Sequence, residues 1–546
     1  MKIKDFIWFS GIWLYPIIEL PVQVISMFSK DILRLNIPPP ILWCIPIPFI
    51  LHHMYLNLKR YKRGHRDFSF EDAIGKKIVS EEDSISKKQA SYPTIPDYYL
   101  SDTPVNFLLG KRDNKYIYYP MTSDGVNIFT VGTPGSGKSV MIQNVLRSNI
   151  LNQSSAKKPF NWALIDIKGE HFKKLVGTES YKATGAELIK VIQPSNRFSY
   201  GWDVFYAVHK PNVTDTMILK AVTDISDSLV CKGGDNPYFE QNGKKIMSGL
   251  LFFYIKEGVD FIPAIQKILR TPFGNLIKDV VAQAEQKGYN IVLDKLKSFV
   301  GKDENESIQD VEATLKTYLD VFSYPDIVYS FHNSEYRTSP AALSDGRTCL
   351  DLAIEESMLE TYQPIFRLIS IQILKYCESD FKESDDRMTW IILDEAARCG
   401  KIPGIENACA TLRSRHVTIW TLYQDISQFH GIYKDQADVL LNLAEIKIFL
   451  SGAGDKKTID YVSNMAGEYE IENISYTKSG LLNSPSDVKY SRGHRPIVTS
   501  KDLMSLRSKN EMIAFVFGNY YRFRKYMYFK DPKLKNISIQ SKGDQL

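Results

Sequence analysis

Hydrophobic residues recur along this chain in short unbroken runs rather than in alternation with polar residues. Eight runs have strand length: "VNIFTV" at 126, "ALIDI" at 163, "LIKVI" at 188, "CLDLAI" at 349, "WIILD" at 390, "VTIWTL" at 417, "EIKIFL" at 445 and "MIAFVF" at 512. Helical patterns separate most of them. An unbroken apolar run indicates a strand that is covered on both faces. The pattern therefore predicts an α/β fold with a mainly parallel sheet.

The interval 208–336 contains no comparable run. It carries long helical patterns instead, including "GKKIMSGLLFFYIKEG" and "DVEATLKTYLDVF". We expect an all-α domain at 208–336, inserted between two parts of one α/β domain at 106–207 and 337–546.

The N-terminal region has a different composition. Phe6–Phe28 and Ile37–Leu56 are each apolar and long enough to span a bilayer. Lysines 2 and 4 and the cluster "KRYKRGHR" at 59–66 flank the two segments, so the positive-inside rule places both ends in the cytoplasm. We expect a two-helix membrane anchor with a polybasic cytoplasmic flank at 1–66 and a polar linker at 67–105. Prolines and a glutamate within these segments leave a second interpretation open, a pair of buried or interfacial helices.

Length, charge and cysteine content restrict the possible domain number, partners and cellular compartment. At 546 residues the chain exceeds what one hydrophobic core normally organises. A net charge of +5 over this length is too small to indicate a nucleic-acid-binding protein by itself. The six cysteines form no CxxC pair and have no histidine at zinc-ligand spacing, so they are typical of thiols in a reducing compartment.

The segment "GTPGSGKS" at 132–139 matches the phosphate-binding pattern G-x-x-x-x-G-K-[ST] between a predicted strand and a predicted helix. The predicted ATP-binding residues are Gly132, Thr133, Pro134, Gly135, Ser136, Gly137, Lys138 and Ser139. Backbone N–H groups of such a loop surround the phosphates, and Lys138 reaches the β- and γ-phosphates. The Ser139 hydroxyl is a ligand for Mg²⁺. The chain is therefore predicted to be a P-loop nucleotide-binding protein.

Two further strand ends are predicted to face the same nucleotide. "WIILDE" ends in Asp394, a candidate Mg²⁺ ligand, and Glu395, a candidate general base for the attacking water. "VTIWTLYQD" ends on Gln424. Because carboxyl ends of parallel strands share one edge of a sheet, Gln424 is expected beside Lys138 and Glu395, where it would sense the γ-phosphate.

The segment between these strands is predicted to contain a helix opened by Pro403 and Gly404. Its apolar face repeats at helical spacing, and Arg413 and Arg415 follow at its end. These arginines have two interpretations. They interact with the helix dipole, or one is an arginine finger offered to a neighbouring subunit.

Four segments together resemble the type IV coupling proteins, the TraD/TraG-like ATPases of conjugation and type IV secretion. They are "GTPGSGKS", "IDIKGEHF" at 165–172, "IILDEAARCGKIPGIENACATLRSRHVTIWTLYQD" and "KTIDYVSNMAGEYE" at 457–470. The resemblance implies a homo-hexameric ATPase with a RecA-like body in the cytoplasm. Its anchor would cross the bacterial inner membrane as a multi-pass segment. It also implies that Arg413 is the finger, Gln424 is the strand-end glutamine, and Asp166 and Lys168 lie near the nucleotide.

The implied partners are single- or double-stranded DNA without sequence preference, a relaxase or effector protein, and the type IV secretion channel. Two other functions stay open: a docking receptor that mainly recruits effector proteins, and a DNA translocase of the FtsK/HerA kind. The aromatic and basic segment at 520–528 also has two interpretations, a platform for single-stranded DNA or a final half-buried strand, and the pattern favours the strand.

Overall fold

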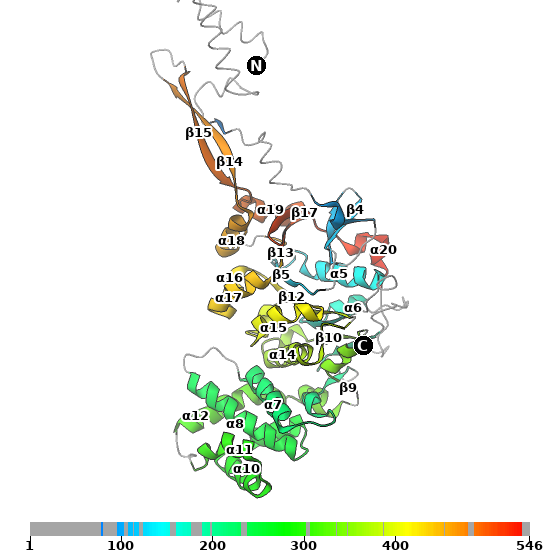
Figure 1. Cartoon of the computed structure of the whole chain (residues 1–546), viewed down its shortest axis with the longest axis vertical. Coiled ribbons are helices and arrows are strands. Elements are labelled where there is room, and N and C mark those ends of the chain that lie inside the picture. The colour runs from blue at the N-terminus through cyan, green and yellow to red at the C-terminus, as the bar shows by residue number, and fades with distance from the viewer. Residues whose placement is uncertain are drawn as a thin grey trace, which may run out of the picture. The chain divides into compact units, whose positions relative to one another are not determined.

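The chain folds into two compact units, and each is described separately. A computed structural model describes residues 78–79, 95–102, 107–112, 114–119, 124–152, 160–175, 188–196, 199–230, 237–301, 306–334, 336–346, 348–385, 387–451, 454–478 and 485–537 (Figure 1). One unit comprises residues 1–91 and 467–497, and the other comprises 92–466 and 498–546. The predicted membrane anchor at 1–66 lies outside the described residues. Within the described part, no helix has the length and hydropathy needed to cross a bilayer.

A nine-stranded sheet forms the centre of the larger unit. Its strands are β5 (Asn127–Val131), β6 (Phe160–Asp166), β7 (Leu188–Ile192), β10 (Thr348–Ala353), β11 (Met388–Leu393), β12 (Val417–Tyr423), β13 (Ile446–Phe449), β16 (Glu511–Val516) and β17 (Asn519–Arg524). Their order is β17-β16-β13-β5-β12-β11-β6-β10-β7. The strands from β13 to β7 are all parallel, whereas β16 and β17 extend one edge in antiparallel pairing. The predicted mainly parallel α/β sheet is confirmed, and all eight apolar runs are strands within it.

The strand register aligns the functional strand ends. Tyr423 at the end of β12 pairs with Val131 at the end of β5. Leu393 at the end of β11 pairs with both Ile165 of β6 and Thr421 of β12. The residues that follow β5, β11, β12 and β6 therefore emerge at one edge of the sheet.

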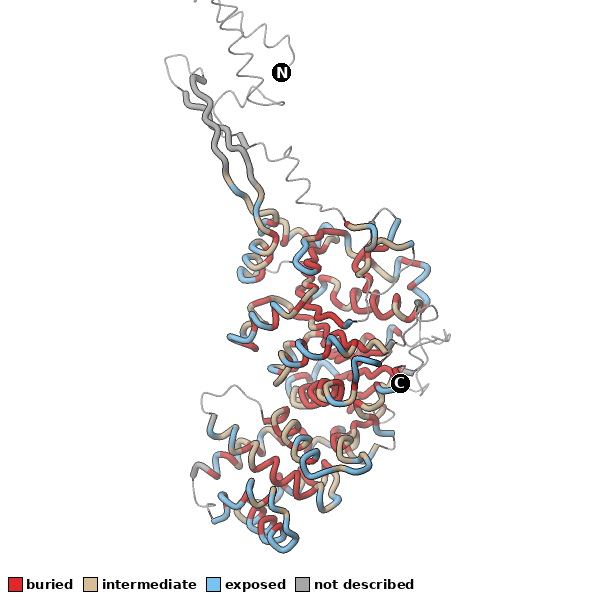
Figure 2. Tube along the Cα trace, in the orientation of Figure 1, coloured by how far each residue is buried: buried red, intermediate tan, exposed pale blue. Residues whose placement is uncertain are grey.

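One face of this sheet packs against a small antiparallel sheet and a helix. The small sheet contains β2 (Leu100–Ser101), β4 (Lys115–Tyr119) and β3 (Phe107–Arg112), in that order. The Phe107 ring lies 5.4 Å from the Trp420 ring and 5.8 Å from the Trp390 ring, between ring centroids. Helix α5 (Lys138–Asn152) contributes Ile142, Val145 and other buried residues to the same core. Figure 2 shows this buried interior in red.

The opposite face is covered by other helices. Phe429 of α16 (Ile426–Tyr433) packs against Phe129 and Tyr423, with ring centroids 5.0 and 4.8 Å apart. The predicted helix after Gly404 is α15 (Ile405–Thr411), and its apolar face is buried. The remaining helices of the α/β part are α6 (His171–Leu175), α14 (Gln363–Asp380), α17 (Ala437–Leu443), α18 (Lys456–Ala466), α19 (Ser500–Lys509) and α20 (Pro532–Lys535).

Seven α-helices follow one another between residues 215 and 328 of the described chain and gather below the sheet in the view of Figure 1. They are α7 (Asp215–Leu229), α8 (Pro237–Lys256), α9 (Phe261–Arg270), α10 (Phe273–Lys287), α11 (Asn290–Leu296), α12 (Glu306–Leu319) and α13 (Pro325–Val328). Arg367 of α14 donates to the Leu229 carbonyl at 3.2 Å, which ties the end of α7 to the α/β part. The two helical runs predicted in this interval are thus confirmed as α8 and α12.

The smaller unit contains a long antiparallel hairpin of β14 (Glu468–Lys478) and β15 (Pro485–Pro496). The two-residue strand β1 (Ile78–Val79) pairs with β14. This hairpin was not predicted, because its sequence has no long apolar run.

Candidate functional site

The loop 132–137 joins the buried strand β5 to helix α5. Gly135 and Gly137 have φ angles of +73° and +106°, a region that favours glycine. The Lys138 ammonium donates to the Gly132 carbonyl at 2.6 Å and is largely buried. Burial lowers the pKa of Lys138, and the nearby Glu395 and Asp394 carboxylates oppose that shift. The loop thus has the conformation of a phosphate cradle with its lysine folded across it.

Asp394 and Glu395 follow β11 at the same edge. Asp394 is 4% exposed, and its Oδ1 atom has no hydrogen-bond partner among the described residues. Glu395 has φ +52°, a strained conformation for a residue with a side chain. One carboxylate oxygen lies 3.8 Å from Lys168 Nζ and the other lies 3.9 Å from Arg398 Nε. The two adjacent acids therefore differ. Asp394 is buried and one of its oxygens has no hydrogen-bond partner among the described residues, whereas Glu395 lies between two cations.

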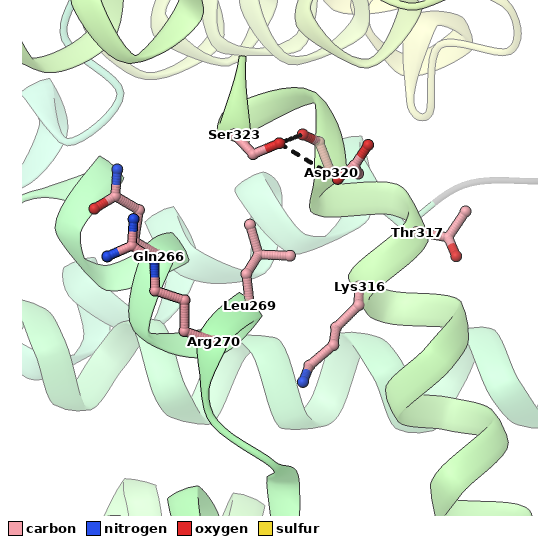
Figure 3. Close-up of a pocket in the computed structure, with 7 residues that line it drawn as sticks. All are labelled: Gln266, Leu269, Arg270, Lys316, Thr317, Asp320 and Ser323. Atoms are coloured by element: carbon pink, nitrogen blue, oxygen red, sulfur yellow. Dashed lines mark hydrogen bonds between the residues drawn. The ribbon is translucent and has the colours of Figure 1, made fainter. Parts of the chain in front are cut away.

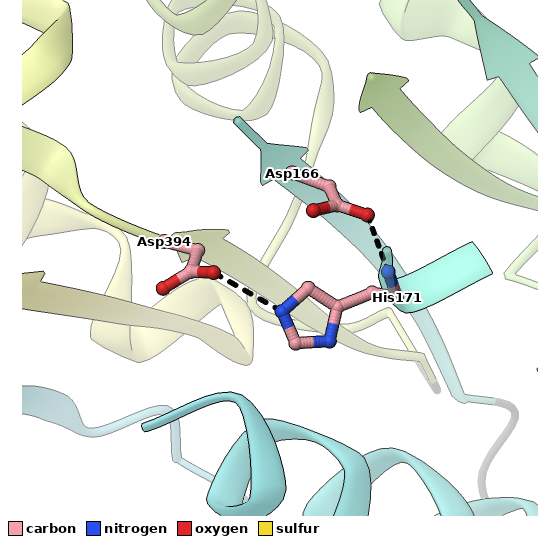
Figure 4. A group of neighbouring side chains, drawn as sticks. All are labelled: Asp166, His171 and Asp394. Atoms are coloured by element: carbon pink, nitrogen blue, oxygen red, sulfur yellow. Dashed lines mark hydrogen bonds and ion pairs between the residues drawn. The ribbon is translucent and has the colours of Figure 1, made fainter. Parts of the chain in front are cut away.

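A histidine joins the acidic strand ends (Figure 4). His171 Nε2 lies 3.1 Å from Asp394 Oδ2, and the His171 amide donates to Asp166 Oδ2 at 2.6 Å. Suitable ligand atoms of all three residues lie within 4.8 Å of one another. Burial disfavours the charged imidazole, but Asp166 and Asp394 together outweigh burial and raise the pKa of His171. Burial also raises the pKa of Asp166.

The Ser139 hydroxyl lies at the first turn of α5, where it donates to Glu170 Oε1 at 3.0 Å. A hydroxyl that donates its proton in this way keeps its oxygen lone pairs for a cation. Glu170 is also paired with Lys174. Partial burial favours a higher pKa for Glu170, but Lys174 and, to a smaller extent, the Ser139 hydrogen bond outweigh burial and lower it.

Gln424 follows β12 beside the start of the P-loop. The Gly132 amide donates at 3.1 Å to the carbonyl of Tyr423, the residue directly before Gln424. The Gln424 backbone amide donates to the Gln428 side-chain oxygen Oε1 at 3.2 Å. Sheet register therefore brings Gln424 to the edge that carries Lys138 and Glu395.

Arg413 lies elsewhere. Its carbonyl accepts from the Gly125 amide at 2.9 Å, just before β5 begins, and its guanidinium lies 2.5 Å from Glu445 Oε1. It is therefore at the amino ends of the strands, at the edge opposite its own P-loop. The Arg415 guanidinium donates to the backbone carbonyls of Glu378 and Cys377. The Arg413 side chain is 45% exposed.

The sequence did not assign Glu170, His171 or the C-terminal Lys525 to the nucleotide site. The first two stand inside the "IDIKGEHF" segment, so their proximity to Asp166 was the available signal. Lys525 donates to the Ser136 carbonyl of the P-loop from 389 residues away, and no spacing rule could reveal that contact.

A separate pocket of about 520 Å³ lies among the helices of the interval 215–334 (Figure 3). Its lining comes from α9, α12 and the turn after α12: Gln266, Leu269, Arg270, Lys316, Thr317, Asp320 and Ser323. Lys316 is already paired with Glu312 at 2.7 Å and donates to the Thr271 carbonyl. None of the strand-end residues contributes to this pocket.

Comparisons with known proteins agree on one family. A family model described as "Type IV secretory system Conjugative DNA transfer" matches residues 80–545. Protein VirD4 of Agrobacterium fabrum is 22% identical over 380 residues, which cover 68% of this chain and 55% of VirD4. Conjugal transfer protein TraG of Rhizobium radiobacter is 26% identical over 200 residues, which cover 36% of this chain and 30% of TraG. The chain thus spans about half the length of the VirD4 proteins it matches.

Solved structures of the conjugative coupling protein TrwB share the fold. Unbound TrwBdeltaN70 has a TM-score of 0.58 at 17% identity, covering 78% of this chain and 91% of that one. TrwB in complex with ADP and Mg²⁺ has a TM-score of 0.57 at 16% identity, covering 84% and 96%. At these identities the likeness establishes the α/β fold alone.

Proposed function

Because the chain belongs to the family of type IV secretory system conjugative DNA transfer proteins, we propose that it is an ATP-hydrolysing coupling protein. It would receive relaxase-bound DNA, or a protein substrate, and drive its transfer into a type IV secretion channel. The observation that carries this proposal is the convergence of the P-loop, Asp394, Glu395 and Gln424 at one sheet edge.

ATP and Mg²⁺ fit the residues present. TrwB has been solved with ADP and Mg²⁺ and with a non-hydrolysable ATP analogue. In this chain Ser139 and Asp394 would hold the ion, because the Ser139 oxygen keeps its lone pairs and Asp394 Oδ1 is buried without a hydrogen-bond partner. Bound Mg²⁺ supplies charge neutralisation of the phosphates.

Separate residues of the chain bind the phosphates, accept the proton and respond to hydrolysis. Lys138 and the loop amides bind the β- and γ-phosphates. Glu395 accepts a proton from the attacking water, and its position between Lys168 and Arg398 orients the carboxylate. Gln424 contacts the γ-phosphate or the attacking water. Loss of the γ-phosphate on hydrolysis would then change the contacts of Gln424 and shift α16, the helix that begins two residues later.

Arg413 would act on a neighbouring subunit of a homo-hexamer. Its place at the amino ends of the strands supports this role, because it cannot reach the nucleotide of its own chain from there. Arg415 is a poorer candidate, because its guanidinium is bound to backbone carbonyls.

As part of this proposal, residues 1–66 would form an inner-membrane anchor with the ATPase body in the cytoplasm, and 67–105 would form a linker. Residues 208–336 would form an all-α domain between the two halves of the nucleotide-binding domain. Two short strands, β1 and β2, fall inside the linker range.

ATP hydrolysis by the full-length chain in detergent, with and without single- or double-stranded DNA, tests the function. A DNA-driven motor predicts stimulation by DNA and loss of turnover in Lys138→Ala. Unstimulated turnover would favour the docking receptor for effector proteins. Absence of nucleotide binding by the wild type would refute the proposal.

A further inference from the structure

The C-terminal segment of the larger unit is bound to the P-loop and to α5. Asn144 of α5 donates to the Tyr526 carbonyl and accepts from the Tyr528 amide, each at 3.0 Å. Arg147 donates to the carbonyls of Leu534 and Ile537 at 3.1 and 2.6 Å. The phosphate-binding helix is therefore held by a chain segment almost four hundred residues away.

This packing decides between the two interpretations of the aromatic and basic segment at 520–528, a platform for single-stranded DNA or a final strand. Tyr521, Phe523 and Tyr526 are each less than 10% exposed, so their rings are not available to stack on DNA. Arg522 is buried and paired with Glu511 at 2.8 Å and Asp502 at 3.3 Å. Residues up to Arg524 belong to the final strand β17, as the pattern favoured, and Lys525 directly after the strand has a different environment.

Lys525 supports the P-loop from outside. Its ammonium donates to the Ser136 carbonyl at 2.8 Å and to the Leu450 carbonyl at 2.6 Å. A methyl group placed on Gly137 would lie 4.0 Å from the Lys525 Cδ atom. The backbone of Lys525 is fixed as well, because its amide donates to the Asn510 carbonyl at 2.8 Å.

Arg507 of α19 lies over the same loop. A methyl group placed on Gly135 would lie 2.9 Å from Arg507 Nη2. Neither Lys525 nor Arg507 forms an ion pair with any residue of the described chain, and the carboxylates of Asp502 and Glu511 are engaged by Arg522. Two cations therefore approach the phosphate loop without a carboxylate to neutralise them.

Uncompensated positive charge around a partly buried ammonium is unfavourable until an anion enters its field. Burial lowers the pKa of Lys525 to about 8, and Arg507 contributes to that shift. The anion that this loop is built to bind is a phosphate chain. The charge imbalance is thus a feature that nucleotide binding would relieve.

We propose that Lys525 and Arg507 are positioning residues of the nucleotide site, which hold the P-loop from the C-terminal segment and favour its phosphate-bound form. This inference rests on the proposed nucleotide binding. Lys525 acts through the Ser136 carbonyl, and both cations add to the positive potential that Lys138 provides. The segment after β17 then belongs to the nucleotide site, although no part of the P-loop pattern includes it.

The test is the affinity of the full-length chain for a fluorescent ADP analogue with Mg²⁺. We expect Lys525→Met to weaken binding on the order of tenfold, the effect of one lost charge-assisted interaction. Lys525→Arg should recover most of that loss, because it restores a cation and donors. Lys530→Met is the matched control, since Lys530 is exposed on the same segment. Thermal unfolding without nucleotide separates a change in binding from a loss of fold.

Arg507→Met keeps the inference testable if Lys525→Met does not fold, because Arg507 is exposed. It should weaken binding several-fold without changing the unfolding temperature of the nucleotide-free protein. Affinities of Arg507→Met and of folded Lys525→Met equal to that of wild type would overturn the inference while leaving nucleotide binding intact. Failure of wild type to bind the analogue, with Lys138→Ala no different, would instead refute the proposed function.

Discussion

His171 Nε2 lies 3.1 Å from Asp394 Oδ2, in a hydrogen bond between two buried side chains that are 223 residues apart. The bond occupies one oxygen of the proposed Mg²⁺-binding carboxylate and leaves the other without a partner. The His171 backbone amide also donates to Asp166 Oδ2, so the backbone that carries the imidazole is fixed to the neighbouring strand end. The orientation of Asp394 is therefore set by the segment that follows β6.

Replacing His171 by Asn tests this arrangement. Loss of a group that orients a metal ligand typically reduces metal affinity or activity about 10- to 100-fold. We expect His171→Asn to require more Mg²⁺ for half-maximal ATP hydrolysis, measured by titrating Mg²⁺ at saturating ATP. His209→Asn is the control, since His209 is half exposed and pairs with Asp203 far along the chain from the strand ends. An unchanged Mg²⁺ dependence would remove His171 from the site.

Gln424→Ala separates sensing from binding. The side chain follows β12 at the P-loop edge but makes none of the contacts that hold the loop itself. We expect the affinity for ATP to stay within about twofold and turnover to fall on the order of tenfold or more, the scale of a lost transition-state contact. Binding of a fluorescent nucleotide and steady-state hydrolysis measure the two effects. Turnover equal to that of wild type would make Gln424 an ordinary strand end.

The position of Arg413 predicts complementation between two inactive variants. Arg413→Ala and Lys138→Ala should each lose ATP hydrolysis when assembled alone. In mixed assemblies, a subunit with an intact P-loop can lie beside a subunit with an intact Arg413, so activity should partly return. Hydrolysis measured against mixing ratio shows this directly. Mixtures that stay inactive would argue that Arg413 does not act between subunits.

The low pKa of Lys525 predicts proton uptake on nucleotide binding. Burial, with a smaller contribution from Arg507, lowers this pKa from 10.5 to about 8. At pH 8.5 Lys525 is mostly neutral in the free protein, and bound phosphate favours its charged form, so binding takes up protons and weakens as pH rises through 8.

Binding enthalpies in two buffers of different ionisation enthalpy at pH 8.5 give the number of protons taken up. Lys525→Met should take up fewer protons than wild type. Equal uptake by both proteins would show that Lys525 does not respond to the nucleotide.

Local patterns predicted much of this molecule. The eight apolar runs are strands because central parallel strands need hydrophobic residues on both faces, and "GTPGSGKS" is a complete local motif. The β3 and β4 strands were missed, since neither "FLLGKR" nor "KYIYY" is an unbroken aliphatic run like those of the central sheet. Strand order was also beyond a single sequence, because β5 lies between β12 and β13, which follow it by about three hundred residues.

The site shows the same division. Lys138, Asp394, Glu395 and Gln424 each follow a recognisable strand, so their shared edge could be predicted. His171 and Lys525 reach the site through tertiary packing, and their role is visible only when distant segments meet. Arg413, predicted as a finger for a neighbouring subunit, lies at the amino ends of the strands, separated from this edge by the full length of the strands.

The most direct test of the account is Glu395→Gln, assayed for nucleotide binding, ATP hydrolysis and transfer of DNA or protein substrate in cells. The amide keeps the shape of the side chain but cannot accept the proton of the attacking water. The account predicts ATP affinity close to that of wild type, with hydrolysis and substrate transfer both abolished. Normal substrate transfer by the Glu395→Gln protein would contradict it.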